Sequence, residues 1–209
     1  LDKHNMVDNV IFSPRANLRF NPTQNINLRL SYSSGFRAPQ AFDEDMHIEN
    51  VGGTVAMIER AKDLKEEKSQ SFSVSADMYH RFGAFQTNLL IEGFYTRLTD
   101  VFVLGKPYDR GDGILVKTRS NGPGAKVMGL TLEGKVAYLS ILQIQAGLTL
   151  QRSRYDEPHK WHDDAPAEKK IFRTPDTYGY FTATCTPVKP LSIALSGTYT
   201  GRMLVQRMD

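Results

Sequence analysis

Apolar and polar residues alternate along most of this 209-residue chain. In the clearest run, 142–154, every second residue from Leu142 to Leu150 is apolar, and Gln143 and Gln145 stand between them. Because successive side chains of a strand point to opposite faces, this pattern predicts strands with one apolar and one polar face. Seven further runs show the same kind of alternation, at about 9–20, 26–33, 71–82, 85–97, 126–138, 177–186 and 191–205. Together with 142–154 they predict about eight long strands.

The connections between these runs alternate strictly between short and long. The short ones are rich in turn-forming residues and lie at 21–25, 83–84, 139–141 and 187–190. The long ones lie at about 35–69, 100–125 and 155–175. Within the second long connection, 114–120 lies between two groups of turn-forming residues and is predicted to continue a strand beyond the membrane.

This sorting of connections favours a bacterial outer-membrane barrel, in which the turns at one end are short and the loops at the other are long. The strands also exceed the usual 5–6 residues and match the ~9–11 that cross a bilayer at a tilt. Aromatic residues near the strand ends are typical of the girdles at membrane interfaces; they are Tyr32, Phe82, Phe85, Tyr138 and Tyr199.

Composition alone gives a different impression. The chain is 40% hydrophobic and its net charge is +3, values that are ordinary for a soluble protein. A barrel wall, however, is polar on one face of every strand. No run approaches the ~18 apolar residues of a membrane helix. Charges of both signs are interspersed, which argues against nucleic acid as a partner, and a single cysteine, Cys185, leaves no disulfide framework or thiolate zinc site.

Two sequence signatures flank the first long connection. The strand at 26–33 runs into Gly-Phe-Arg-Ala-Pro at 35–39, and the next strand follows Leu-Lys-Glu-Glu-Lys-Ser at 64–69. The pair resembles the C-terminal barrel region of TonB-dependent outer-membrane receptors, where a GFRAP-like turn ends one strand and an LKPE-S-like turn precedes the next. Glu66 stands where proline is usual. The resemblance covers nearly the whole chain.

The resemblance implies an all-β fold. It would be an antiparallel up-and-down meander whose strands form part of a 22-stranded barrel in the outer membrane of a Gram-negative bacterium. Residues 1–209 would be a C-terminal part of the barrel domain, with the plug domain, the N-terminus and the last strands outside the chain. Its function would be active uptake of a scarce nutrient such as siderophore-iron, haem or a corrinoid, without enzymatic activity or a cofactor. The partners would be the plug domain of the same polypeptide, the TonB complex, the lipid bilayer and a small nutrient ligand.

In such a barrel, charged residues within the strands must face the lumen, because a charge facing lipid at mid-bilayer costs ~2–4 kcal/mol. Arg29, Glu133 and Gln145 are therefore predicted to face the lumen, together with Asp77, Glu92 and Lys135. The apolar partners of the alternation are predicted to face lipid: Leu28, Leu30, Leu130, Leu132, Ile144, Leu148 and Leu195.

No catalytic constellation is present: the chain has no phosphate-binding glycine loop, nucleophile elbow or metal-spaced histidine pair on a regular element. The candidate ligand-binding residues are His159, Trp161 and His162 in the third long connection, and His47 in the acidic run after Pro39. Imidazoles, a flat indole and nearby lysines suit haem or an anionic siderophore better than a neutral sugar. No metal site is predicted. The acidic run is expected to pair with other loops, including Arg37.

Two alternatives belong to other classes. The first is a passive porin or other outer-membrane barrel, which shares the strand pattern and needs no energy input. The second is a soluble carbohydrate-binding β-sandwich, which composition alone favours. A sandwich has no physical reason to sort its loops by length.

Overall fold

The computed structural model describes residues 11–39, 56–106, 108–111, 115–160 and 166–205. These residues form strands, turns and irregular segments, and none of them lies in a helix that is long and apolar enough to span a membrane. The main sheet has eight long strands: β1 (Arg15–Thr23), β2 (Ile26–Arg37), β4 (Glu67–Phe82), β5 (Phe85–Thr99), β9 (Ala125–Tyr138), β10 (Leu142–His159), β12 (Thr177–Val188) and β13 (Leu191–Thr200).

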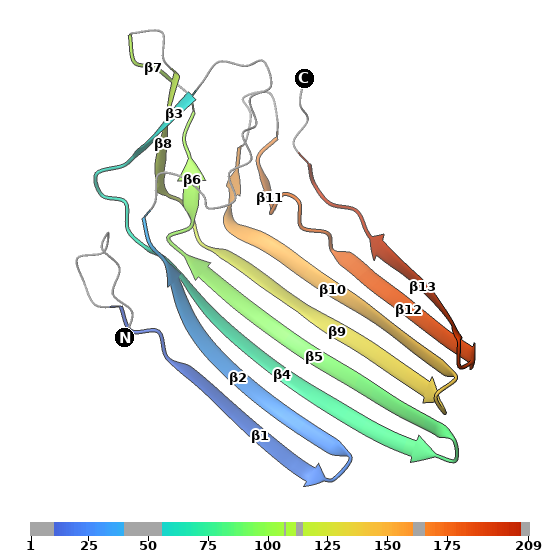
Figure 1. The fold of residues 1–209 in the computed structure, drawn as a ribbon. Coiled ribbons are helices and arrows are strands. Elements are labelled where there is room, and N and C mark those ends of the chain that lie inside the picture. Colours follow the sequence, from blue (N-terminus) through green and yellow to red (C-terminus); the bar gives the residue numbers. More distant parts are fainter. Residues whose placement is uncertain (1–10, 40–55, 107, 112–114, 161–165, 206–209) are drawn as a thin grey trace.

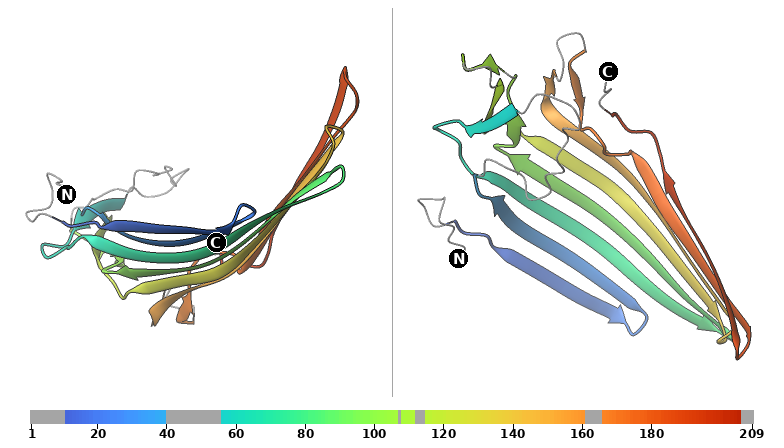
Figure 2. Two further views of the ribbon diagram at one scale, coloured as in Figure 1. Left: turned by 90° about the horizontal axis from the view of Figure 1, so that it is seen from below. Right: turned by 45° about the horizontal axis from the view of Figure 1, so that its top comes forward.

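The eight long strands follow one another in chain order, and every neighbouring pair is antiparallel. The predicted up-and-down meander is therefore confirmed. Figure 1 shows all the short turns at one end of the sheet and all the long connections at the other. We call these the short-turn end and the long-loop end. The strands curve together as one layer into an open trough (Figure 2).

Several predicted boundaries shift by a few residues. β1 begins at Arg15 and continues to Thr23, so the first short turn is only Gln24–Asn25 and not 21–25. The register of β1 and β2 shifts between Phe20 and Thr23, and this irregularity accommodates Asn21 and Pro22, which were predicted to lie in the turn. β10 extends to His159, beyond the predicted end at 154, because a short strand, β11 (Glu168–Lys170), pairs with its outer part.

A second, small sheet lies above the strand ends at the long-loop end (Figure 1). It contains β3 (Ala56–Arg60), β6 (Phe102–Leu104), β7 (Tyr108–Asp109) and β8 (Leu115–Asn121). The strand predicted at 114–120 corresponds to β8, but it pairs in parallel with β3 and antiparallel with β6 and β7. It is thus part of a separate loop sheet and does not continue a strand of the main sheet.

The main sheet has one apolar and one polar face. Leu30, Val74, Gly93, Leu130 and Leu150 form one continuous cross-strand row. All seven leucine and isoleucine residues predicted for the apolar face are exposed in this sheet, Leu195 to 62%. Arg29, Glu133 and Gln145 occupy the alternate positions, as predicted: Gln145 lies opposite Lys135, and Glu133 opposite Leu90.

The uncovered apolar face argues against the β-sandwich. Among the described residues only Ala38, Val116 and Ala125 are buried hydrophobic residues, whereas a sandwich buries the inner faces of two sheets against each other. Here no second layer of described residues covers the main sheet (Figure 2). The apolar face needs another apolar environment.

Aromatic residues mark both edges of the apolar band. At the short-turn end, the rings of Phe82 and Phe85 stack at 5.4 Å, and Phe85 lies 4.8 Å from Tyr138. Toward the long-loop end, Tyr32 and Phe72 lie 4.7 Å apart. Phe72 and Phe82 are ten residues apart in β4, or about 33 Å along the strand. At a tilt of about 40° this spans about 25 Å, the height of the lipid-facing band of outer-membrane barrels.

Candidate functional site

The candidate site is the long-loop end, where the three long connections come together (Figure 1). The first connection contains β3, the second contains β6, β7 and β8, and the third contains β11. β3 and β8, from two different connections, pair from Ala56↔Leu115 to Arg60↔Arg119. The first two connections therefore form one structural unit, which we call the loop unit, and are not independent loops.

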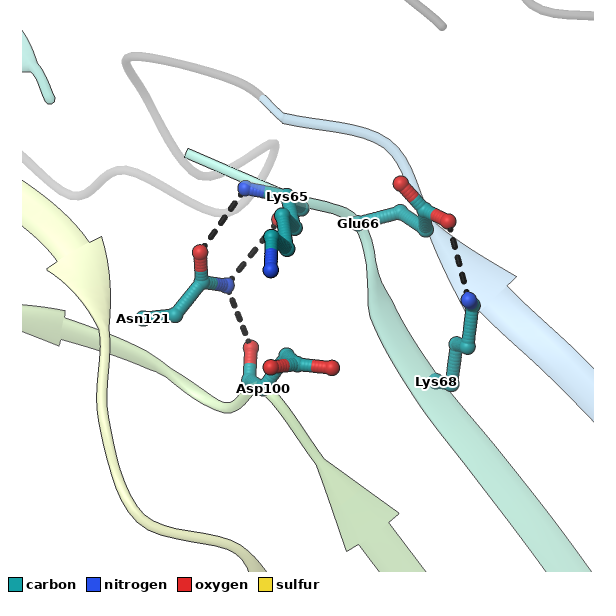
Figure 3. A network of polar contacts seen from close by, with 5 residues as sticks. All are labelled: Lys65, Glu66, Lys68, Asp100 and Asn121. Carbon is teal, nitrogen blue, oxygen red and sulfur yellow. Dashed lines mark hydrogen bonds and ion pairs between the residues drawn. The ribbon is translucent and has the colours of Figure 1, made fainter. Parts of the chain in front are cut away.

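Asn121 fixes this unit to the rim of the main sheet (Figure 3). Its Oδ1 accepts a hydrogen bond from the backbone N–H of Lys65 at 2.8 Å. Its Nδ2 donates to the carbonyl oxygens of Lys65 at 3.0 Å and of Asp100 at 2.8 Å. Asp100 follows β5 and has a left-handed φ of 55°, which asparagine and aspartate tolerate better than most residues. One side-chain amide thus joins the two long connections where each meets the main sheet.

The residues after Lys65 strengthen this junction. Glu66 and Lys68 form an ion pair at 3.0 Å (Figure 3). The pKa of the Glu66 carboxyl lies below its usual range, chiefly because a backbone N–H donates to it and secondarily because Lys68 pairs with it, while partial burial opposes the shift. Glu67 Oε2 accepts a hydrogen bond from the backbone N–H of Phe102 at 3.0 Å. The LKPE-S-like segment therefore anchors the loops, with Glu66 in an ion pair.

Phe102 is the aromatic centre of the loop unit. The guanidinium of Arg37 lies 5.6 Å from its ring centroid and that of Arg119 lies at 5.8 Å. Cations over an aromatic face attract its quadrupole. The acidic run expected to pair with Arg37 lies outside the described residues, so that pairing stays a prediction.

Beside the third connection, Arg97 of β5 and Asp156 in the outer part of β10 form a two-point ion pair. Arg97 Nη1 donates to Asp156 Oδ1 at 2.6 Å, and Nη2 lies 2.5 Å from Oδ2. The pKa of Asp156 lies below its usual range, mainly because of the hydrogen bond from Arg97. Lys169 Nζ donates to the backbone carbonyl of Asp156 at 2.8 Å. These contacts hold β11 and the outer part of β10 against β5.

Below the loops, the polar face carries a hydrogen-bonded network. Gln145 Nε2 donates to Glu133 Oε1 and to Tyr180 Oη, both at 2.9 Å. The hydroxyls of Thr131 and Thr149 are 3.0 Å apart. These contacts cross three neighbouring strands, β9, β10 and β12. The face therefore offers hydrogen-bond partners to water or to polar protein groups.

The predicted ligand-binding residues are only partly described. His159 is the last residue of β10 and pairs with Glu168 of β11, so its backbone lies on a strand and not in a loop. Trp161, His162 and His47 lie outside the described residues. Within the described part of the chain, no group of three or more His, Cys, Asp or Glu side chains is arranged to bind a metal ion. A ligand role for the four residues stays a prediction.

Sequence reasoning did not find the role of Asn121. The residues Asn121, Gly122, Pro123 and Gly124 were interpreted only as turn formers. An asparagine whose side chain bonds the backbone is common in turns, but its partners here are 21 and 56 residues away. The residue type of Asn121 therefore indicated that its side chain could bond the backbone, but nothing in the sequence indicated which distant residues it would contact.

Comparison with known proteins gives a consistent result. Residues 3–203 match the family model described as TonB dependent receptor-like, beta-barrel. A search of curated protein sequences finds no match.

Three solved structures share the fold at low sequence identity. The FrpB iron transporter from Neisseria meningitidis (F3-3 variant) has a TM-score of 0.60 at 17% identity, covering 90% of this chain and 26% of that one. The siderophore receptor PirA from Pseudomonas aeruginosa has a TM-score of 0.60 at 18% identity, covering 90% and 34%. The alcaligin outer-membrane receptor FauA from Bordetella pertussis has a TM-score of 0.54 at 17% identity, covering 92% and 30%.

The chain spans about a quarter to a third of the length of these structures. Because their sequence identity to this chain is low, the likeness supports the fold alone. The family model, in contrast, covers almost the whole chain. The chain therefore belongs to the TonB-dependent receptor-like β-barrel family, whose members are receptors and transporters and not enzymes.

Proposed function

We propose that this chain forms part of the barrel wall of an outer-membrane receptor that takes up a scarce nutrient actively. The observation that carries the proposal is the two-faced main sheet, with an exposed apolar band bounded by aromatic residues on one face and a polar network on the other. A lipid bilayer covers the apolar face. The polar face lines the lumen of a larger barrel, completed by strands that pair with the outer edges of β1 and β13.

The long-loop end faces the external medium in this proposal, and the short-turn end faces the periplasm. Outer-membrane barrels place their short turns and long loops in this way. The lumen holds a plug domain of the same polypeptide, and the polar network around Gln145 offers that domain hydrogen-bond partners. Coupling to the TonB complex supplies the energy for transport.

The nutrient class we favour is an iron chelate or haem, with a corrinoid as a further member of the class. FrpB is an iron transporter and PirA is a siderophore receptor by name, which supports this class for a chain of the same family. His159, Trp161, His162 and His47 are the proposed ligand contacts. Lys160 adds positive charge beside the first three, which favours an anionic chelate.

The experiment uses the intact receptor expressed in the outer membrane of a Gram-negative strain that lacks its own iron receptors. The probes are ⁵⁵Fe-labelled catecholate and hydroxamate siderophores and haemin. We expect saturable uptake of one probe that a protonophore abolishes, since TonB needs the proton gradient. Uptake that is unsaturable and insensitive to the protonophore would favour the passive porin instead.

A triple variant tests the ligand contacts. Replacing His159, Trp161 and His162 by alanine should weaken binding of the transported probe about 10-fold or more, the loss typical of a few well-packed contacts. The amount of receptor in the membrane should stay unchanged. The matched control replaces Lys106, Asp109 and Arg110 of the second connection. Unchanged affinity in the first variant would remove the third connection from the binding site.

A further inference from the structure

Four cationic side chains form one row across the long-loop end of the main sheet. Arg97 of β5 pairs with Lys126 of β9, Lys126 pairs with Arg154 of β10, and Arg154 pairs with Lys170 of β11. Like charges directly opposite each other on neighbouring strands destabilise a sheet. Four successive cations are therefore unfavourable unless anions lie among them.

The two outer members of the row have acidic partners. Arg97 binds Asp156 through two contacts. Lys170 Nζ lies 2.5 Å from Asp176 Oδ2. Both ion pairs are partly exposed, and together they neutralise the outer ends of the row and not its middle.

The two middle members of the row have no such partner among the described residues. Within the described residues, no side chain forms a hydrogen bond or ion pair with Lys126, Arg154 or the neighbouring Arg152. We call these three residues the basic cluster. They line a depression of ≈ 320 Å³ together with Met128, Tyr155, Asp156 and Lys169. Counting Lys169, four cations surround this depression and Asp156 is the single acid in its lining, which leaves it electropositive.

The basic cluster lies on the apolar face of the sheet, just beyond the apolar band. Leu130 and Leu150 pair directly, as do Lys126 and Arg154 four residues further toward the long-loop end. Residues an even number apart in a strand share a face. Arg152 pairs with Met128 between these two rows. The cations therefore face outward, on the side opposite to the proposed lumen.

An apolar groove begins directly below the cluster. Gly93 stands between Val74 and Leu130 in a cross-strand row and has no side chain to fill the space. The resulting depression of ≈ 750 Å³ is lined on the apolar face by Leu30, Val74, Leu130 and Leu150, and Arg152 lies at its upper edge. A cationic depression and an apolar groove thus meet at Arg152, on one face of the sheet.

We propose that this face binds a phosphorylated glycolipid of the outer leaflet. Lys126, Arg152 and Arg154 bind a headgroup phosphate, and one acyl chain occupies the groove at Gly93. The inference rests on the proposed membrane orientation, in which the long-loop end lies at the outer surface. The phosphate supplies the negative charge that the cationic row lacks.

The combination of features selects a lipid over other anions. A free phosphate would use the cations but would leave the groove empty. A nucleic acid would need a longer basic surface, whereas the cluster adjoins an exposed apolar band. Basic residues at the edge of a membrane-spanning surface gain roughly 1 kcal/mol each near anionic lipid, and the long arginine side chains can reach headgroup oxygens while their stems stay in the apolar region.

The test uses the intact receptor purified in a non-ionic detergent. Its probes are radiolabelled bis-phosphorylated lipid A, the dephosphorylated lipid, and inorganic phosphate. We expect the combined substitutions Lys126→Gln, Arg152→Gln and Arg154→Gln to weaken binding of the phosphorylated lipid roughly 100-fold, at about fivefold per basic residue. The control removes three charges from the opposite face, by Arg19→Gln, Arg29→Gln and Lys135→Gln, and should bind this lipid as the wild type does.

The groove has its own variant. A β-carbon at Gly93 would contact only Val74 Cγ1, at 3.7 Å, so Gly93→Leu should fold and fill the groove. We expect it to weaken binding of the phosphorylated lipid several-fold. Any of three results would overturn the proposal. The wild type and the triple variant could bind the phosphorylated lipid equally, the two lipids could bind equally to the wild type, or inorganic phosphate could bind as tightly as the phosphorylated lipid.

Uptake of the iron probe is measured on the same variants. If lipid binding depends on the basic cluster but no probe is transported, the proposed transport function fails and the lipid site stands. If transport occurs and lipid binding does not depend on the cluster, only the lipid site fails. The two proposals can therefore be judged separately.

Discussion

The ring of Tyr180 lies over Gly147, the residue directly opposite it on the neighbouring strand: a β-carbon at Gly147 would lie 2.6 Å from Tyr180 Cε1. The same arrangement recurs between Phe181 and Gly197, where a β-carbon at Gly197 would clash with Phe181 Cε1. An aromatic ring that covers a cross-strand glycine fills the space left by the missing side chain and fixes the register of the pair.

We predict that Gly147→Ala destabilises the barrel. The added methyl group would displace the ring of Tyr180, whose hydroxyl oxygen accepts a hydrogen bond from Gln145 Nε2. Overpacking of this kind costs about 1–3 kcal/mol. The measurement is the unfolding temperature of the intact receptor in detergent. The control is Gly134→Ala, since a β-carbon at Gly134 meets nothing within 4 Å, and it should be neutral or slightly stabilising. Equal effects of the two substitutions would contradict the role of Tyr180.

The alternation of residues such as Leu148 and Gln145 was sufficient to predict the eight long strands, their two faces and the lengths of the connections between them, but not the short strands β3, β6, β7 and β11. This succeeded because a two-residue period specifies the face of every residue at once. The pattern could not predict which strands pair, so β8 was expected to extend the main sheet and instead pairs with β3. The cover of Gly147 by Tyr180 also depends on register, which turn and loop lengths set. Within the long connections, the sequence pattern located one strand, β8, but gave no guide to the placement of the predicted ligand residues.

We predict that Asn121→Asp loosens the loop unit more than Asn121→Leu does. The asparagine Nδ2 donates to two carbonyl oxygens, and a carboxylate oxygen in its place would repel both. Each lost hydrogen bond costs about 0.5–1.5 kcal/mol, so local opening should become easier by about 1–3 kcal/mol. The measurement is amide hydrogen exchange at Lys65, whose N–H is bound by Asn121.

The exchange experiment has an internal reference and a control. Amides in the centre of β9 and β10 should exchange as in the wild type, because the hydrogen bonds of the main sheet do not depend on the Asn121 side chain. Lys117→Gln, on the same strand as Asn121, removes a charge that makes no polar contact with the described residues. Faster exchange at Lys65 in this control would show that any change in β8 suffices.

We predict a small, pH-dependent stabilisation from Asp156. Its pKa in the folded chain is lowered, first by the hydrogen bond from Arg97 and then by the charges of Arg97 and nearby lysines. The stabilisation is therefore fully present above the unfolded pKa of about 3.9 and is lost as the pH falls through the lowered folded value. Because both side chains are about one third exposed, the effect should stay below about 1 kcal/mol.

The measurement for this pair is the unfolding temperature of wild type and Asp156→Asn between pH 3 and pH 7. The difference between them should be largest at neutral pH and should shrink toward zero in the acid range. Arg97→Gln should remove most of the pH dependence of the difference, since Arg97 supplies the main contacts that lower the pKa of Asp156 and only the charges of the nearby lysines remain. A difference that grows on acidification would reverse the sign of the linkage and contradict the assignment.

The last prediction concerns the faces of the main sheet in the membrane. Leu148 pairs with Leu132 on the apolar face, while Gln145 binds Glu133 and Tyr180 on the polar face. Spin labels are attached at Leu148→Cys and Gln145→Cys, with Cys185 replaced by alanine, in the intact receptor in liposomes. We expect the label at 148 to be relaxed mainly by lipid-soluble oxygen and the label at 145 mainly by a water-soluble nickel chelate. A shift of one residue would exchange the two faces. The reverse result would therefore show that the polar network faces lipid. Equal access of both labels to oxygen would show that the apolar band is not the lipid-facing surface.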